Sequence, residues 1–331
     1  MGSGRGAGAE GPGQGTRVAL PKRRTVAQSA KKLVFLIVPL EEVMAASPIV
    51  VGYDASDGAH AALGWALDEG ARTGDPVALV HAYEWPPEGG AIHLADSGEP
   101  GDGERRHAQE AVVTALAWAR DTHPDVTVTG TAVRGAAAAV LVEQSKHARM
   151  MVLGSRGHGG FTGLLIGSTS LTVSVHAHCP VVVVRGQKPP GDAPVLVGVD
   201  GSEGAMLAAE FAFAEAAAGG TSLRVLRAWT PPPPRREPTA RDPVEIAVTE
   251  QTETQEAITP LRDKYPQVSA TVHVVAGQAG RVLVDATRGA RLVVVGSRGM
   301  GGLRGMLLGS VSQQLLHHAH CPVAVVRERP T

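Results

Sequence analysis

Residues 51–59 read VGYDASDGA, and residues 197–205 read VGVDGSEGA, an offset of 146 positions. Later landmarks recur at an offset of 142 positions, and residues 154–184 and 296–326 agree at 19 of 31 positions. Biased composition alone does not produce agreement of this extent. Because self-similarity at a fixed period marks a repeated structural unit, the chain is predicted to contain two homologous units.

The length of the chain agrees with two domains. Its 331 residues and 34.1 kDa exceed the usual size of one domain, and two units of about 140 residues can each bury a core. We expect a first domain at 47–187, a linker at 188–191 and a second domain at 192–331. Residues 1–46 are expected to be a disordered or wrongly included N-terminal extension, with Met44 as the native start.

Each unit is predicted to alternate strands with helices. Strands of the first unit are expected at Ile49–Tyr53, Pro76–Tyr83, Val126–Val133, Met150–Gly154 and Val181–Arg185. Helices are expected at Ser56–Arg72, with Ser56 as N-cap, and at Glu104–Arg120, Ala136–His147 and Ser168–His176. The second unit has the same pattern, with strands at Val195–Val199, Ser222–Ala228, Val268–Val275, Leu292–Gly296 and Val323–Arg327. Because this alternation gives right-handed crossovers, we predict an α/β fold of two tandem Rossmann-like domains, each a five-stranded parallel sheet flanked by helices.

Composition excludes several classes of function. The formal net charge of -1 gives no broad field of one sign, so we expect no nucleic-acid partner. The two cysteines are too few for a disulfide framework, which favours a reducing cytoplasm. No stretch reaches the ~18 apolar residues of a membrane span. The apolar run Leu33–Leu40 resembles a signal peptide only superficially, because it is short and contains Pro39.

A glycine loop follows the fourth strand in both units. The first unit has Gly154-Ser-Arg-Gly157, nine residues, and then Gly167-Ser168. The second unit repeats this spacing with Gly296, Gly299, Gly309 and Ser310. Glycines permit positive φ and let main-chain N–H groups approach an anion, and the helix that follows adds its N-terminal donors. Although glycines often serve only as turns, the duplicated strand, loop and helix context predicts an anion-binding loop.

In each unit, one aspartate follows the carboxyl end of the first strand. Asp54 and Asp200 are expected at the carboxyl edge of the sheet, where a carboxylate can accept hydrogen bonds from a base or a ribose. The alternative is an acid that caps the following helix. Both roles can hold together, so the sequence leaves them open. The loop is not a Walker motif, because no lysine precedes Ser168 or Ser310, and neither first strand is followed by a dinucleotide fingerprint.

These motifs together resemble the ATP-binding subclass of the universal stress protein family. The resemblance rests on G-x-x-G, nine residues and G-[ST], with V-G-x-D-x-S on the first strand, and it covers nearly all of residues 47–328. It implies domains of the adenine nucleotide alpha hydrolase type. It also implies that Val181–Arg185 and Val323–Arg327 pair across a pseudo-twofold axis, so that the two domains form an intrachain dimer. Whether two chains associate further is left open.

The resemblance further implies that adenine lies against the first-strand Asp and the main chain after the second strand, with phosphates on the glycine loop. The residues implicated in the first unit are Asp54, Ala82, Gly154, Gly157, Gly167, Ser168 and Thr169. Those of the second unit are Asp200, Ala228, Gly296, Gly299, Gly309 and Ser310. Val311 stands where the first unit has Thr169, so the second site lacks one hydroxyl and is expected to bind more weakly.

The expected function is that of an ATP-binding regulator of the stress response, with ATP bound alone or with Mg²⁺. One alternative is a slow ATPase or autophosphorylating enzyme, for which no convincing catalytic set is visible. The other is an interaction protein without nucleotide. The histidines before Cys179 and Cys321 could suggest a metal, but a helix end that leads into a buried strand explains them better. Arg156 and Arg298 could contact phosphate or be solvated loop residues.

Overall fold

The computed structural model describes residue 1 and residues 47–84, 102–157, 165–186, 192–230, 242–301 and 308–327. The expected N-terminal extension, apart from residue 1, and the expected linker lie outside these residues. So do the middle parts of both glycine loops. Among the described helices, none is long and apolar enough to span a bilayer.

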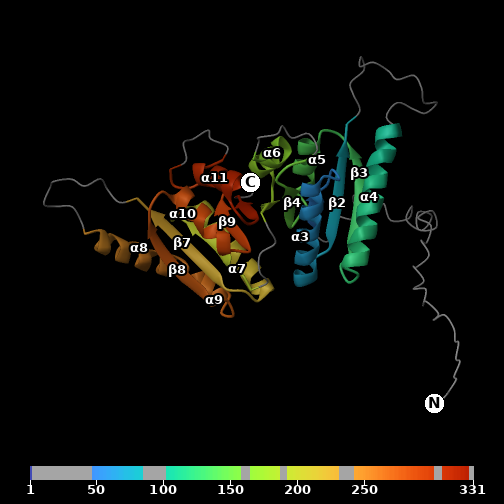
Figure 1. Cartoon of the computed structure of the whole chain (residues 1–331). Helices are drawn as coiled ribbons and strands as arrows, with labels where there is room; N and C mark the ends of the chain where they lie inside the picture. Colours follow the sequence, from blue (N-terminus) through green and yellow to red (C-terminus); the bar gives the residue numbers. More distant parts are fainter. Residues whose placement is uncertain are drawn as a thin grey trace. The chain divides into compact units, whose positions relative to one another are not determined.

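Ten strands form the framework of the chain (Figure 1). The first repeat contains β1 (Ile49–Gly52), β2 (Val77–Tyr83), β3 (Val128–Arg134), β4 (Met150–Gly154) and β5 (Val181–Val184). The second repeat contains β6 (Val195–Val199), β7 (Leu223–Trp229), β8 (Ala270–Ala276), β9 (Leu292–Gly296) and β10 (Val323–Val326). All the predicted strands are present. Their valine-rich runs are typical of parallel strands that are covered on both faces.

The strands of both repeats join into one sheet. Its order is β3-β2-β1-β4-β5-β10-β9-β6-β7-β8. All neighbours within a repeat are parallel, whereas β5 and β10 are antiparallel, with Val182 opposite Ala324. The predicted pairing of the two final strands is therefore confirmed, and it fuses two five-stranded sheets into a continuous structure.

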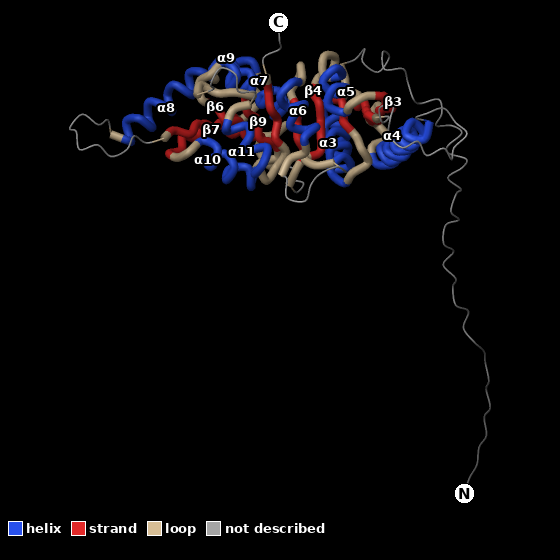
Figure 2. The backbone as a smooth tube through the Cα atoms, turned by 90° about the horizontal axis from the view of Figure 1, so that it is seen from above, coloured by secondary structure: helices blue, strands red, loops and turns tan. Residues whose placement is uncertain are grey.

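Helices cover both faces of this sheet. Those of the first repeat are α3 (Asp57–Thr73), α4 (Asp102–Thr122), α5 (Ala137–Gln144) and α6 (Ser168–His176). Those of the second are α7 (Glu203–Gly219), α8 (Pro243–Ala257), α9 (Thr259–Lys264), α10 (Ala279–Ala286), the short 3₁₀ helix η3 (Thr287–Gly289) and α11 (Ser310–His318). One core lies beneath α3, α4 and α7, and the other beneath α5, α6, α10 and α11. Figure 2 shows α8 and α9 on the opposite side of the strands from α10 and α11.

One helix of the second repeat differs from the prediction that both units are alike. The first repeat has a continuous α4, whereas its counterpart is divided at Ile258 into α8 and α9. Pro260 is the second residue of α9 and has no N–H to donate to the carbonyl four residues earlier. Because proline is tolerated only in the first turn of a helix, a new helix begins there. Ile258 is fully buried at the break.

A buried ionic cluster joins α3 to α7. The Glu69 and Glu215 side chains are each 1% exposed. Arg72 pairs with Glu69 and, at 3.3 Å, with a carboxylate oxygen of Glu215. Arg149, which immediately precedes β4, reaches the other Glu215 oxygen at 2.9 Å and also pairs with Asp75. Two carboxylates thus lie buried between the repeats, with arginines around them.

This environment changes the ionisation of Glu215. Burial and then the charge of Glu69 raise the pKa of the Glu215 carboxyl to about 8, against the opposite pull of Arg149 and Arg72. The carboxyl therefore carries its proton at neutral pH. A neutral Glu215 avoids a second buried negative charge beside Glu69, which would be costly in a medium of low dielectric constant.

Candidate functional site

Each repeat has a cavity at the carboxyl edge of the sheet. The cavity of the first repeat, the first cavity, measures about 390 Å³, and that of the second repeat, the second cavity, about 310 Å³. In the sheet, β2 and β3 lie on one side of β1, and β4 lies on the other side of β1. The cavities lie beside the first and fourth strands of each repeat. These are the switch points at which open α/β sheets bind ligands.

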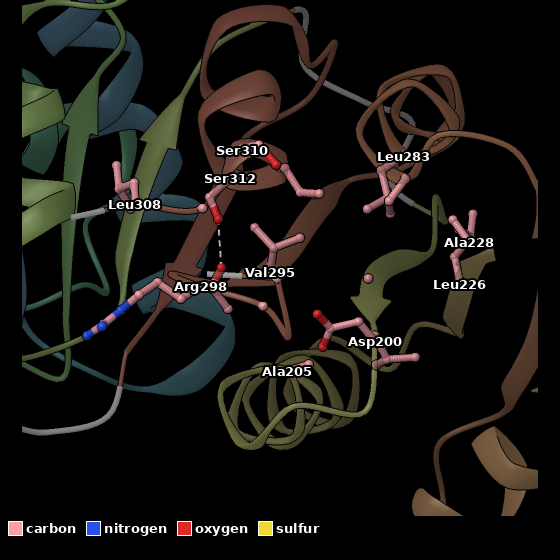
Figure 3. Close-up of a pocket in the computed structure, with 18 residues that line it drawn as sticks. Asp200, Ala205, Leu226, Ala228, Leu283, Val295, Arg298, Leu308, Ser310 and Ser312 are labelled. Carbon is pink, nitrogen blue, oxygen red and sulfur yellow. Dashed lines mark hydrogen bonds between the residues drawn. The ribbon is translucent and has the colours of Figure 1, made fainter. Parts of the chain in front are cut away.

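The structure brings all the predicted site residues to these two cavities. The first cavity is lined by Asp54, Ala82, Gly154, Gly157, Gly167, Ser168 and Thr169. The second is lined by Asp200, Ala228, Gly296, Gly299, Gly309 and Ser310, with Val311 in place of the threonine. Figure 3 shows the second cavity, with Asp200 and Ala228 on one side and Ser310 on α11 on the other.

The first-strand carboxylates organise the start of the following helix. Asp54 Oδ1 accepts hydrogen bonds from the amide and the hydroxyl of Ser56 at 3.0 and 2.6 Å. The Ser56 hydroxyl in turn accepts from the Ala59 amide at 3.2 Å, as the predicted N-cap of α3. Asp200 and Ser202 repeat this arrangement at the start of α7. The serine is therefore the cap, and the aspartate positions it.

The same carboxylates lie against the glycine loop. Asp200 Oδ2 accepts from the Met300 amide at 2.8 Å. A Cβ on Gly299 would lie 2.2 Å from that oxygen, and a Cβ on Gly157 would lie equally close to Asp54 Oδ2. Neither glycine has a positive φ. The sequence argument from positive φ is therefore wrong at these positions, where close approach of the carboxylate is what excludes a side chain.

Close approach also explains the first glycine of each loop. A Cβ on Gly154 would lie 2.5 Å from the carbonyl carbon of Gly58, in the first turn of α3. The corresponding distance from Gly296 to Gly204 is 2.8 Å. Glycines on both sides of this contact let the helix start pack directly on the end of the fourth strand. Where the fourth strand meets this helix start, the cavity wall is therefore built from main chain.

The third glycine is different, because a Cβ there would make only ordinary van der Waals contacts. Gly167 precedes α6 with φ -73° and ψ 150°, and no side chain caps this helix. A Cβ on Gly167 would lie 3.7 Å from Ser155 O and 4.0 Å from Gly157 N. At Gly309, before α11, the nearest atom would be Arg298 Cα at 3.4 Å. The space between the strand-end turn and the helix N-terminus is thus free for a ligand and faces main-chain donors.

Several lining residues were not predicted. Ser170 in α6 donates to Gly154 O at 2.7 Å, and Ser312 in α11 donates to Gly296 O at 2.8 Å. These bonds fix each helix N-terminus to the end of its neighbouring strand. The repeated S-x-S spacing after the third glycine could have revealed them. Leu141 of α5 and Leu283 of α10 add an apolar wall, which required knowledge of how the helices pack.

The charged residues at the cavities are few. Among the described lining residues, the first cavity has Asp54 and Arg156, and the second has Asp200 and Arg298. Figure 3 shows the Arg298 side chain directed away from Asp200. Tyr53 differs from its counterpart Val199, and its hydroxyl contacts His60 Nδ1 at 2.9 Å. Burial and then the charge of Asp54 raise the pKa of Tyr53.

The cysteine segments have the environment of a packed core. Cys179 and Cys321 are buried thiols in the core beneath α6 and α11, and neither forms a disulfide. Burial raises the pKa of the Cys321 thiol to about 12, so it stays protonated and unreactive at neutral pH. Within the described parts of the chain, no three His, Cys, Asp or Glu residues gather in a group that could hold a metal.

Fold and cavities together define a class: a duplicated, doubly wound α/β protein with a glycine-walled cavity at each switch point. The model of the universal stress protein family matches this chain twice, at residues 46–185 and 193–327. The chain therefore belongs to the universal stress protein family.

Two relatives and one solved structure align with most of this chain over nearly their own whole length. Universal stress protein Rv2623 of Mycobacterium tuberculosis is 38% identical over 292 residues, which cover 86% of this chain and 97% of the relative. A universal stress protein of Mycolicibacterium smegmatis is 34% identical over 294 residues, with coverage of 85% and 97%. The crystal structure of a universal stress protein from Archaeoglobus fulgidus aligns with a TM-score of 0.62 at 20% identity, covering 86% of this chain and 99% of that chain.

Proposed function

We propose that each cavity binds one adenine nucleotide, with ATP as the preferred ligand, and that occupancy of the two cavities controls the partners of the chain during stress. Membership of the family supports a stress-response role. The observation that carries the proposal is the cavity space beside Gly167 and Gly309. It is bordered by a main-chain turn and by a helix N-terminus without a side-chain cap.

The shape of the cavities supports a nucleotide rather than a small anion. Volumes of about 390 and 310 Å³ fall within the range of about 300 to 1,000 Å³ that is usual for cofactor sites. One end of each cavity is polar main chain that suits phosphates. The other end has apolar side chains, including Ala82 and Leu141 in the first cavity, that suit a flat base.

The charges at the cavities support binding rather than turnover. Efficient phosphoryl transfer uses acids that hold the metal, a base for the nucleophile and a cation at the terminal phosphate. Each cavity offers one carboxylate and one arginine among its described lining residues. The carboxylates already accept hydrogen bonds from Ser56 and Ser202. We therefore propose a nucleotide-dependent regulator and not a kinase-like enzyme.

Calorimetric titration of the purified chain with ATP, with and without Mg²⁺, tests this proposal. We expect two equivalents of ATP per chain. Turnover of labelled ATP should stay well below about 1 per second, the low end of ordinary kinases. Absence of heat with millimolar adenine nucleotides would refute the assignment. Fast turnover would instead identify an enzyme.

The difference between Thr169 and Val311 predicts unequal sites. A hydroxyl that donates to a charged phosphate contributes about 1.5 to 3 kcal/mol, so the first site should bind ATP at least about tenfold more tightly. Exchange of the two side chains, Thr169→Val with Val311→Thr, keeps the volume of each nearly constant. The order of the two affinities should then reverse. Unchanged affinities would show that the Thr169 hydroxyl does not contact the ligand.

A further inference from the structure

A second, polar groove lies beside the second cavity and includes residues of the loop that follows β9. It measures about 280 Å³ and is lined by Ser202, Glu203, Gly204, Ser297, Arg298, Gly299 and Arg327. The groove shares Arg298 and Gly299 with the second cavity. Two arginines therefore meet at a helix N-terminus, next to a loop that we propose to bind phosphate.

These two arginines have no acidic partner among the described residues. Arg327 follows β10 and is partly buried, and its Nη1 atom is buried without a hydrogen-bond partner in the described part of the chain. Burial and then the nearby charge of Arg298 lower the pKa of the Arg327 guanidinium. Because a buried donor without a partner costs about 1 to 3 kcal/mol, an anion that accepts from Arg327 would be stabilised there.

The first repeat shows what the same arginine does when it has a partner. Arg185, which follows β5, donates to the main-chain carbonyls of Leu315 and Leu316 in α11. Its Nη1 atom is thereby satisfied by the opposite repeat. Arg327 has no such bond among the described residues, although β5 and β10 are related by the pseudo-twofold pairing. Each arginine keeps one buried nitrogen without a hydrogen-bond partner in the described part of the chain, Nε in Arg185 and Nη1 in Arg327, so the two repeats differ in which nitrogen is satisfied.

Glu203 is the one acid among the described residues of the groove. It is exposed in the first turn of α7 and forms no ion pair with either arginine. Its charge stabilises the N-terminus of α7 and opposes any anion in the groove. The two arginines outweigh it, so the net charge of the described lining is positive.

We propose that this groove binds a phosphate group through Arg298 and Arg327. The phosphate can be an outer phosphate of a nucleotide in the second cavity or a free inorganic anion. The inference adds to the proposed function without depending on it, because an inorganic anion could bind to an empty chain. Guanidinium groups suit this ligand, since their planar fork donates two hydrogen bonds to a phosphate.

Calorimetry on the full chain with ATP, AMP and inorganic pyrophosphate tests the groove. Arg327→Gln should weaken binding of either ATP or pyrophosphate by about tenfold, as expected for loss of one charged hydrogen bond. AMP binding should not change. If Arg327→Gln loses affinity for ATP alone, the groove binds an outer phosphate of the nucleotide. If it loses affinity for pyrophosphate, the groove binds a free anion. Glu203→Gln should strengthen the same interaction, because it removes the opposing charge.

The matched control is Arg288→Gln, which removes an exposed arginine of η3 outside the groove. Arg327→Lys should retain part of the affinity, since it keeps the charge and loses the fork. Unchanged ATP and pyrophosphate affinities in Arg327→Gln would overturn the groove and leave the proposed function intact. An equal loss for AMP would show a merely structural role. If the chain binds pyrophosphate in a way that depends on Arg327 but does not bind ATP, the proposed nucleotide binding is refuted and the phosphate site in the groove is supported.

Discussion

Replacement of Gly167 with valine is expected to remove ATP binding from the first cavity and to leave the fold intact. The backbone of Gly167 has φ -73° and ψ 150°, which any residue can adopt. Its added Cβ would meet nothing closer than 3.7 Å, whereas the branches of valine would occupy the space that faces Gly157 N. Calorimetry should then give one equivalent of ATP per chain, at millimolar ligand, instead of two.

Gly309→Val should remove the other equivalent, and the double variant should bind no ATP. Gly289→Val is the control, because a Cβ at Gly289 has no neighbour within 4 Å and this residue lines neither cavity. Thermal unfolding of each variant checks that the fold is retained. Two equivalents of ATP in the double variant would place the phosphates away from both helix N-termini.

The second large effect is a loss of stability as the pH rises, caused by Glu215. The pKa of this carboxyl is raised to about 8, against an ordinary glutamate value of about 4.3. The native chain therefore holds a proton that the unfolded chain releases. The stability that this proton contributes is complete below about pH 4.3 and is lost progressively until about pH 8. Within this window the free energy of unfolding should fall by up to about 1.4 kcal/mol per pH unit.

Glu215→Gln should flatten this dependence, because an amide keeps a neutral polar group in the same place. The groups that face Glu215 are Glu69, Arg72, Arg149 and Arg291, with Asp75 beyond Arg149. Denaturant unfolding at pH 5 to 9 measures the slope for each variant. The control is Glu253→Gln, at an exposed position of α8. Equal slopes in the wild type and Glu215→Gln would show that Glu215 is ionised throughout.

The sequence predicts the framework well, for local reasons. The strands are short apolar runs bounded by glycine, proline or polar residues, and Met150–Gly154 and Val195–Val199 have the predicted bounds. The N-cap at Ser56 follows from chemistry that acts within four residues. Duplication supplied a second reading of each element. The division into α8 and α9 was not predicted, because the second unit was expected to repeat the continuous helix of the first, and Pro260 interrupts it.

The part of the cavity lining that follows the strand ends was also predictable, since the carboxyl ends of parallel strands meet at one edge of the sheet. The physical reason for glycine at positions 157 and 299 was not predictable from the sequence. That reason is the close approach of an aspartate that follows another strand. The proximity of Glu69 and Glu215 is even harder to predict from the sequence. Residues 146 positions apart meet only because β5 and β10 pair in the middle of the sheet.

The antiparallel join between β5 and β10 has an evolutionary consequence. In an assembly of two identical polypeptides, one codon change alters both halves at once. Here each half is encoded separately, so a mutation can change the residues of one cavity and leave those of the other cavity unchanged. The pairs Thr169 and Val311, and Tyr53 and Val199, record such divergence. Under the proposed function, the two cavities of one chain can therefore differ in their affinity for the same ligand, whereas two copies of one polypeptide carry identical cavities.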